Sequence, residues 1–457
     1  MNDLLAARLG MAMSLAFHIL FAAAGITMPL LMVISEGRWL RTRDPVDLEL
    51  TKRWMKGTAI LFAVGAVSGT VLSFELGLLW PRFMRWAGPI IGMPFSLEGF
   101  AFFLEAIFLG IYLYGWNRVR PLVHWLSGVV IAVSGCVSGI FVVMANAWMN
   151  TPVGFRMVDG RPVEVDPYAA MFNPAAFHQT LHMTIAAYQA IAFVALGIHA
   201  FVLLRHPGHA FHRRALTILL PVAAIAAVLQ PLSGDVSAKF VARWQPAKLA
   251  AMEGHWDTAR RVPLLIGGVP DERAETTRWG IGIPGGLSFL AFGDPDAEVK
   301  GLKAFPRADR PPVLVTHFAF QLMVGCGVAM LLVALAGLAL WAKRRAPPLD
   351  RRYLQLLVLA SPLGLLALEA GWTVTEVGRQ PWVVYGVMRT ADAVTPMPHL
   401  VVPMITIAAV YLFLGVVVIA LLRHQVFTAT RDERSTPVAA AASEVGPDTA
   451  RSDREAS

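Results

Sequence analysis

The sequence predicts an all-α, polytopic integral membrane protein with nine transmembrane helices. Of its 457 residues, 56% are hydrophobic and only 15% are charged, whereas about a quarter of the residues in a soluble domain are charged. Apolar runs long enough to cross a bilayer recur along the chain. Because a helix satisfies its own backbone hydrogen bonds within lipid, such runs indicate transmembrane helices.

The nine expected spans follow one another with mostly short connections. They cover residues 9–35, 56–80, 94–116, 122–148, 179–204, 214–233, 312–342, 353–377 and 400–423. Each can cross a hydrocarbon core of about 30 Å at about 1.5 Å per residue, with some tilt. The first run is too long for the core of a signal peptide, so we expect it to be retained as a helix.

The predicted organisation has four parts. Residues 1–233 hold the first six helices, residues 234–311 form a long extracytoplasmic loop, residues 312–427 hold the last three helices, and residues 428–457 form a disordered cytoplasmic tail. Arginine and lysine are concentrated in the odd-numbered short loops. By the positive-inside rule, the amino terminus therefore lies outside and the carboxyl terminus in the cytoplasm.

The net charge of +8 does not indicate nucleic-acid binding, because the basic residues lie in short loops between apolar runs. The sequence contains no CxxCH motif for covalently attached haem and no Walker-type phosphate loop. It also shows no internal repeat, which counts against the inverted-repeat transporters.

Ionisable side chains inside the apolar runs are the strongest functional signal. Because a charge in a membrane helix is costly, such residues are functional candidates. They are Glu75, Glu98, Glu105, Glu369, Glu376, His18, His182 and His317. The combination favours proton movement, metal or haem chemistry, or both. A proton-coupled membrane transporter is the alternative that would also place glutamates and histidines in helices.

The expected depths of these residues converge on the outer leaflet. Glu98 and Glu105 are seven residues apart, hence on one helix face, and we expect them in the outer half of the third span. His178 and His182 are one turn apart on one face, and their spacing does not choose between them as ligands.

Several sequence strings carry a family resemblance. EAGW at residues 369–372 precedes GRQPW at 378–382, KLAAME occupies 248–253 in the long loop, and ANAWM at 145–149 closes the fourth span. With nine spans in this order, the chain resembles subunit I of the cytochrome bd-type quinol oxidases over essentially its whole length except the tail.

The resemblance implies three haems and their ligands. His182, rather than His178, matches the histidine of a low-spin haem b, and Met323 matches its methionine partner. His18 matches the histidine of a high-spin haem b. Glu376 matches the carboxylate ligand of the other high-spin haem, which is haem d or a further haem b in its place.

The resemblance also implies the roles of the surrounding residues. Lys248 and Glu253 match residues of the quinol-binding loop, where Lys248 could polarise a ring oxygen and Glu253 could accept a hydroxyl proton. Glu98 and Glu105 are the candidates for final proton delivery. Arg379 of GRQPW is implied in the catalytic centre, and Trp372 of EAGW in haem binding.

The implied activity is that of a quinol:oxygen oxidoreductase in the bacterial cytoplasmic (inner) membrane, an electrogenic terminal oxidase that is not a proton pump. It oxidises quinol at the outer face and reduces O2 to water with protons from the cytoplasm. The implied partners are subunit II of the oxidase, membrane quinol and O2. A small single-helix subunit is a further expectation.

The chain departs from many relatives at two points. Its outer loop is short, as in the branch that includes the cyanide-insensitive members. Gln321 stands two residues before the haem methionine, where many relatives have an arginine. The substitution removes a cation from the surroundings of the low-spin haem.

Overall fold

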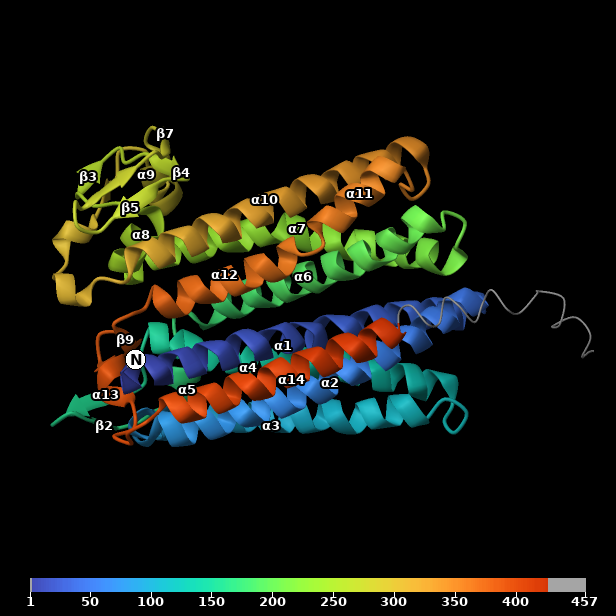
Figure 1. Ribbon diagram of the computed structural model, residues 1–457, viewed down its shortest axis with the longest axis horizontal. Helices are drawn as coiled ribbons and strands as arrows, with labels where there is room; N and C mark the ends of the chain where they lie inside the picture. The colour runs from blue at the N-terminus through green and yellow to red at the C-terminus, as the bar shows by residue number, and fades with distance from the viewer. Residues whose placement is uncertain (1, 426–457) are drawn as a thin grey trace, which may run out of the picture.

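The computed structural model describes residues 2–425 and confirms the predicted fold class (Figure 1). Within this part of the chain, nine helical segments are long and apolar enough to cross a membrane. They are α1 (Asp3–Thr42), α2 (Pro45–Leu79), α3 (Pro81–Tyr114), α4 (Pro121–Asn150), α6 (Ala176–Arg205), α7 (Ala210–Trp244), α10 (Val313–Arg344), the pair α11 (Arg351–Ala360) and α12 (Leu363–Val377), and α14 (Val401–Arg423). The predicted tail, residues 428–457, lies outside the described residues.

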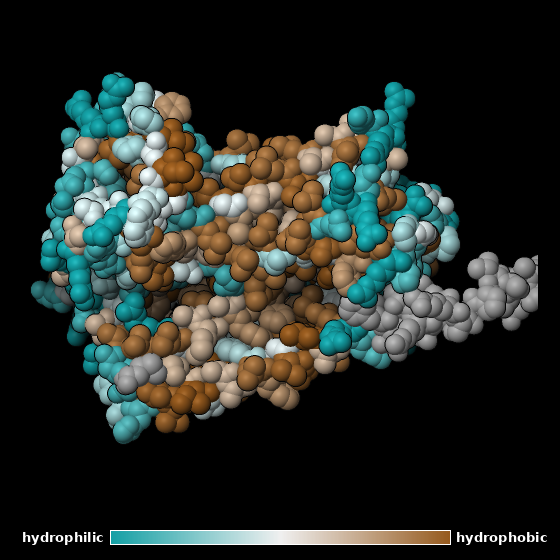
Figure 2. All heavy atoms as spheres, turned by 45° about the horizontal axis from the view of Figure 1, so that its top comes forward, coloured by the Kyte–Doolittle hydropathy of each residue, from teal (hydrophilic) through white to brown (hydrophobic). Residues whose placement is uncertain are grey.

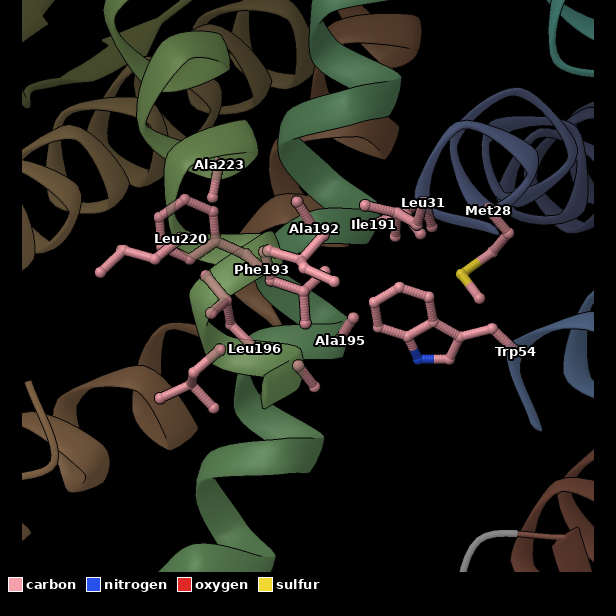
Figure 3. Close-up of a cluster of buried hydrophobic side chains, with 14 of the residues drawn as sticks. Met28, Leu31, Trp54, Ile191, Ala192, Phe193, Ala195, Leu196, Leu220 and Ala223 are labelled. Atoms are coloured by element: carbon pink, nitrogen blue, oxygen red, sulfur yellow. The ribbon is translucent and has the colours of Figure 1, made fainter. Parts of the chain in front are cut away.

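The helices form two groups that lie side by side (Figure 1). One group contains α6, α7, α10, α11 and α12, and the other contains α1, α2, α3, α4 and α14. Helix α1 also packs against α6, which joins the two groups. At this junction Met28 and Leu31 of α1 and Trp54 of α2 lie close to Ile191 of α6 in one buried apolar cluster (Figure 3).

The surface matches the membrane assignment. A broad hydrophobic belt crosses the middle of the molecule, and hydrophilic residues gather at both ends (Figure 2). Large apolar side chains such as Phe74, Phe100 and Leu412 are exposed on the transmembrane helices. Lipid or a partner subunit covers such side chains at no hydrophobic cost, because the surroundings are themselves apolar.

Several helices extend beyond the sequence-based spans. Helix α2 begins at Pro45 rather than at residue 56. Helix α3 begins at Pro81, well before residue 94, and continues through Pro89 and Pro94. Glu98 therefore lies near the middle of this helix, and Glu105 lies two turns further along it. Helix α7 continues to Trp244. The eighth span is interrupted between α11 and α12, where Pro362 removes a backbone donor.

The long connection between α7 and α10 folds into a small domain at one end of the bundle (Figure 1). Its core contains Leu249, Val262, Leu287 and Val299. Its elements are α8 (Pro246–Glu253), β3 (Ala259–Arg260), β4 (Leu264–Ile266), β5 (Val269–Asp271), β6 (Thr276–Arg278), β7 (Ile281–Ile283), α9 (Gly286–Phe292), β8 (Glu298–Val299) and the 3-10 turns Leu302–Ala304 and Arg307–Asp309. The pairs β3–β8, β4–β7 and β5–β6 are all antiparallel.

The amino-terminal end of α1 lies at the same end of the bundle as this loop domain (Figure 1). The shorter elements between the other helices are α5 (Pro167–Met171), α13 (Thr390–Ala393) and the antiparallel pairs β1 (Arg156–Val158) with β2 (Arg161–Val163) and β9 (Trp382–Val384) with β10 (Met388–Arg389). They lie at this end too (Figure 1). The loop domain, these short elements and the start of α1 thus gather at one end of the bundle.

Candidate functional site

Glu376, in the last turn of α12, lies in a polar cluster made by three segments. The Asn146 side chain of α4 donates from Nδ2 to Glu376 Oε1 at 2.5 Å. Arg379, just beyond the helix, donates from Nη2 to Glu376 Oε2 at 2.5 Å. The carboxylate is thereby oriented by one neutral and one charged donor, and such charge-assisted contacts are the stronger kind.

Arg379 is almost fully buried, yet its Nε and Nη1 atoms have no hydrogen-bond partner among the described residues. Buried donors are nearly always satisfied, and an unsatisfied one is costly. A guanidinium presents its donors in a plane that suits carboxylate oxygens. The free donors of Arg379 therefore fit an acidic or oxygen-bearing group, such as the propionates of a haem.

Lys248 joins the loop domain to this cluster. Its Nζ donates to Asn150 Oδ1, Gln245 Oε1 and the Thr375 carbonyl oxygen, each at 3.2 Å. Three acceptors engage all three donors of an ammonium group. Burial, reinforced by the nearby Arg379 cation and opposed by Glu376, lowers the pKa of Lys248 to about 7.

Glu253 ends α8, five residues after Lys248, and only 4% of its surface is exposed. Its Oε2 atom has no partner among the described residues. Burial raises the pKa of the Glu253 carboxyl to about 8, because desolvation disfavours the charged form. The side chain can thus hold or release a proton near neutral pH.

The two candidate ligand histidines are held by the same serine arrangement. His18 Nδ1 of α1 lies 3.0 Å from Ser68 Oγ, and Ser68 donates to the Gly65 carbonyl oxygen at 3.0 Å. His182 Nδ1 of α6 lies 2.9 Å from Ser233 Oγ. Ser233 likewise donates to the carbonyl oxygen three residues earlier, that of Gln230, at 2.9 Å.

A hydroxyl has one hydrogen, so each serine must accept from the histidine Nδ1–H. The tautomer is then fixed, and Nε2 carries the lone pair that a metal needs. At His182, Gln230 Nε2 lies 3.1 Å from Nε2 and 3.4 Å from Nδ1 of the ring. Orienting Nδ1 partners of this kind are typical of metal-ligating histidines.

Glycines leave room beside the candidate ligands. A Cβ at Gly69 would lie 3.0 Å from His18 Cε1, and one at Gly371 would lie 3.1 Å from the Met323 sulfur. Any larger residue at either position would press on the ligand. Met323 of α10 thus rests against α12, the helix that carries Glu376.

The structure does not by itself choose between His178 and His182. His178 Nδ1 lies 3.1 Å from Ser237 Oγ, and its buried Nε2 has no partner among the described residues. Both histidines therefore present a nitrogen that could bind a metal.

Glu98 and Glu105 lie on the face of α3 that packs against α4. Ser138 of α4 donates to Glu98 Oε1 at 3.2 Å. A Cβ at Gly135 would lie 3.1 Å from the Glu105 carboxyl, so that glycine leaves space for it. The predicted common face is present.

Among the remaining sequence candidates, Glu369 has a buried Oε1 without a partner among the described residues, and three others contact neighbouring elements. Glu75 of α2 accepts a 2.7 Å hydrogen bond from Ser14. Trp372 is partly buried against the core cluster. Gln321 binds the loop domain: its Nε2 donates to the Leu265 carbonyl oxygen at 3.0 Å, and its Oε1 accepts from Gly267 N at 3.1 Å. The residue that replaces the arginine of many relatives thus fastens the loop domain to α10.

The sequence alone did not identify Asn146, Ser68 or Ser233 as site residues. Asn146 could have been identified, because it is a polar side chain inside an apolar run. The two serines could not, because a serine–histidine pair on different helices has no characteristic sequence spacing.

In the described part of the chain, no group of three or more histidine, cysteine, aspartate or glutamate side chains could hold a metal ion. The candidate ligands are single donors on different helices. A porphyrin supplies four nitrogen ligands itself and needs one or two from the protein, so this donor set fits haem iron. Fold and site together define a haem-type membrane oxidoreductase.

Comparison with known proteins gives the family. The family model of cytochrome bd terminal oxidase subunit I matches residues 6–429. The chain belongs to this family, and it is a multi-pass subunit of a respiratory terminal oxidase in the bacterial inner membrane. Members of the family contain haems, and subunit I normally pairs with a subunit II.

Individual relatives agree over nearly the whole chain. A putative cytochrome bd menaquinol oxidase subunit I of Bacillus subtilis (strain 168) is 36% identical over 431 residues, which are 93% of this chain and 96% of the relative. A cytochrome bd ubiquinol oxidase subunit 1 of the same organism is 32% identical over 93% of this chain and 94% of the relative. The structure of bd oxidase from Geobacillus thermodenitrificans matches with a TM-score of 0.86 and 37% identity, over 95% of this chain and 99% of that chain.

Proposed function

We propose that this chain is the haem-bearing subunit of a quinol:oxygen oxidoreductase. In this proposal quinol is oxidised at the outer face, and O2 is reduced to water with protons from the cytoplasm. Family membership and the menaquinol and ubiquinol oxidase activities named for two relatives support it. The observation that carries it is the contact of Lys248 in the loop domain with the Thr375 carbonyl, one residue before Glu376.

The proposed haem ligands are the residues expected from the resemblance. His182 and Met323 would hold a low-spin haem b, His18 a high-spin haem b, and Glu376 a haem d or a further haem b in its place. When bound, such haems would supply electron transfer and oxygen reduction. The tautomers that Ser68 and Ser233 impose support the two histidine assignments.

Glu253 is proposed to accept the proton of the quinol hydroxyl. Its buried Oε2 without a partner and the raised pKa of its carboxyl support that role. Lys248 is proposed to polarise a quinol oxygen. All three donors of Lys248 are engaged, so a quinol oxygen would have to replace one of the three acceptors. Gln245, at the start of α8, is the acceptor nearest to Lys248 in sequence.

Glu98 and Glu105 are proposed to deliver protons to the oxygen-reducing centre. Their common face on α3 and the small residues opposite them on α4 support a polar route through an otherwise apolar region. With the amino terminus outside, protons and electrons would reach the centre from opposite sides. Turnover would then be electrogenic without a separate proton pump.

The proposed assembly contains subunit II and a small single-helix subunit, with membrane quinol and O2 as substrates. The exposed apolar side chains of α3 and α14 leave surface for helical partners. No nucleic acid is expected as a partner.

A reduced-minus-oxidised spectrum of the purified complex, together with extraction of its pigments, tests the proposal. We expect a low-spin b component, a high-spin component that responds to carbon monoxide, and oxygen consumption when reduced quinone is supplied. A folded complex made with ample haem that is colourless and consumes no oxygen would refute it.

A further inference from the structure

His317 lies between two carbonyl oxygens. Only four residues beyond the start of α10, its side chain is fully buried. Its Nδ1 is 2.8 Å from the Met252 carbonyl oxygen, and its Nε2 is 3.2 Å from the Gly267 carbonyl oxygen. The sequence alone offers only a packing role for this residue, so these contacts come from the fold.

Two carbonyl acceptors need two N–H donors. A neutral imidazole has one N–H, and its other nitrogen carries a lone pair that would face the second oxygen. The ring nonetheless brings one nitrogen to each oxygen. A buried carbonyl that loses its donor is costly, so removal of the ring should loosen both segments.

The two carbonyl groups belong to segments that matter for the loop domain. Met252 precedes Glu253 in the last turn of α8, where the carbonyl groups carry the negative end of the helix dipole and favour a cation. Gly267, with φ of +69°, forms the turn after β4. The nitrogen of this same Gly267 donates to Gln321, one helical turn beyond His317.

His317 and Gln321 therefore form one face of α10 that holds both the end of α8 and the Gly267 turn. Charged groups on the surrounding elements are Lys248 and Glu253 of α8 and the Asp271–Arg278 pair of the β5–β6 hairpin. Glu272, in the same hairpin, accepts a hydrogen bond from Val313 N at the start of α10. From Val313 to Trp341, α10 itself contributes no aspartate, glutamate, lysine or arginine.

We propose that His317 is a positioning residue for quinol oxidation, whose ring fastens the end of α8 and the Gly267 turn to α10. This proposal rests on the proposed function of Glu253. The two contacts would hold the last turn of α8 in place, and with it the Glu253 side chain.

Two substitutions test the two contacts. His317→Leu removes both ring nitrogens. His317→Gln keeps two N–H groups on one amide. His206→Gln, at an exposed histidine in the connection after α6, is the matched control.

The readouts are the KM for quinol, kcat, and amide hydrogen exchange across residues 246–268 of the purified complex. His317→Leu should raise KM about tenfold or more, with a smaller change in kcat and faster exchange. Its reduced-minus-oxidised spectrum should stay unchanged.

His317→Gln should retain slow exchange and a KM within about twofold of that of the His206→Gln control. Unchanged KM and exchange in His317→Leu, or a rise in both in His317→Gln as large as in His317→Leu, would overturn the proposal. If His317→Leu fails to fold, His317→Asn, whose shorter amide cannot reach both oxygens, takes its place.

Hydrogen exchange needs no substrate. An unmodified complex that consumes no oxygen with quinol would therefore refute the proposed function without deciding whether His317 fastens the loop. If exchange in such a complex is slow and becomes faster in His317→Leu, His317 does fasten the loop domain. Its role in quinol oxidation would then be refuted, while the structural contact would stand.

Discussion

Arg379 donates one hydrogen bond to Glu376 and keeps two further donor atoms, Nε and Nη1, without partners in the described part of the chain. The cation and the carboxylate belong to one short segment, since Arg379 follows Glu376 by three residues. Arg379 is buried and the Glu376 side chain is 28% exposed, so the pair joins a buried cation to a partly exposed carboxylate. A group bound beside this pair would meet both a carboxylate oxygen and donors without partners.

Arg379→Met should lower quinol-dependent oxygen consumption about 10–100-fold, the range typical of partners that orient a metal ligand. The high-spin component of the spectrum should weaken or shift, while the low-spin component stays. Arg389→Met is the control, because Arg389 contacts the Asp309 carboxylate and the Trp382 ring instead. A normal high-spin signal and normal turnover in Arg379→Met would contradict the assignment.

Ser68→Ala and Ser233→Ala should each weaken one haem component, because the Nδ1 acceptor that fixes the histidine tautomer is lost. We expect about 10–100-fold weaker haem retention, measured as haem content after dilution and washing of the purified complex. Ser73→Ala on the exposed face of α2 is the control for Ser68. Equal loss of the same component in both variants would show that the two serines do not serve separate centres.

Glu253→Ala should impair quinol oxidation while the haem spectrum stays intact. In the unmodified protein the carboxylate forms as pH rises toward about 8, so the rate of quinol oxidation should rise over the same range. Glu253→Gln should abolish that rise. Loss of all haem signal in Glu253→Ala would refute its role as a substrate contact.

The pKa of Glu253 also predicts a stability effect. The folded state binds the proton more tightly than the unfolded chain, whose carboxyl has a pKa near 4.5. Stability should therefore fall as pH rises from about 4.5 through about 8. Glu253→Gln should flatten this part of the profile in thermal unfolding of the complex.

Glu105→Gln should slow oxygen reduction by about 100-fold or more, because an amide cannot relay a proton. Haem content should be normal, and proton uptake into proteoliposomes should slow with turnover. Glu49→Gln on α2 is the control, since that side chain is exposed and pairs with Arg53. Normal turnover in Glu105→Gln would remove this residue from the proton route.

Asp47 provides a stability prediction away from the site. Its fully buried carboxylate contacts Arg214 at 2.5 Å and Arg38 at 3.4 Å, which ties α2 to α7 and α1. Arg214→Met should cost about 3 kcal/mol, because a buried charge loses its nearer partner. Arg213→Met, at the exposed neighbouring position, should leave the melting temperature of the detergent-solubilised complex almost unchanged.

The sequence by itself determined the class of the fold. Long apolar runs with few charges leave no alternative to membrane helices, because lipid offers no partner to an unpaired backbone group. It also determined the family, since residues 378–382 and 248–253 are local strings that need no structure to be read. The common face of Glu98 and Glu105 followed from helical periodicity alone.

Only the tertiary structure decided which side chains meet. Ser68 with His18, Asn146 with Glu376, and His317 with Met252 join residues distant in sequence. Helix packing sets these pairs, and packing depends on the whole set of contacting surfaces. The sequence-based start of the third span was likewise too late, since α3 begins at Pro81 and contains Pro89 and Pro94. Periodicity fixes the face on which a residue lies, but the neighbours that fill the opposite face come from other parts of the chain.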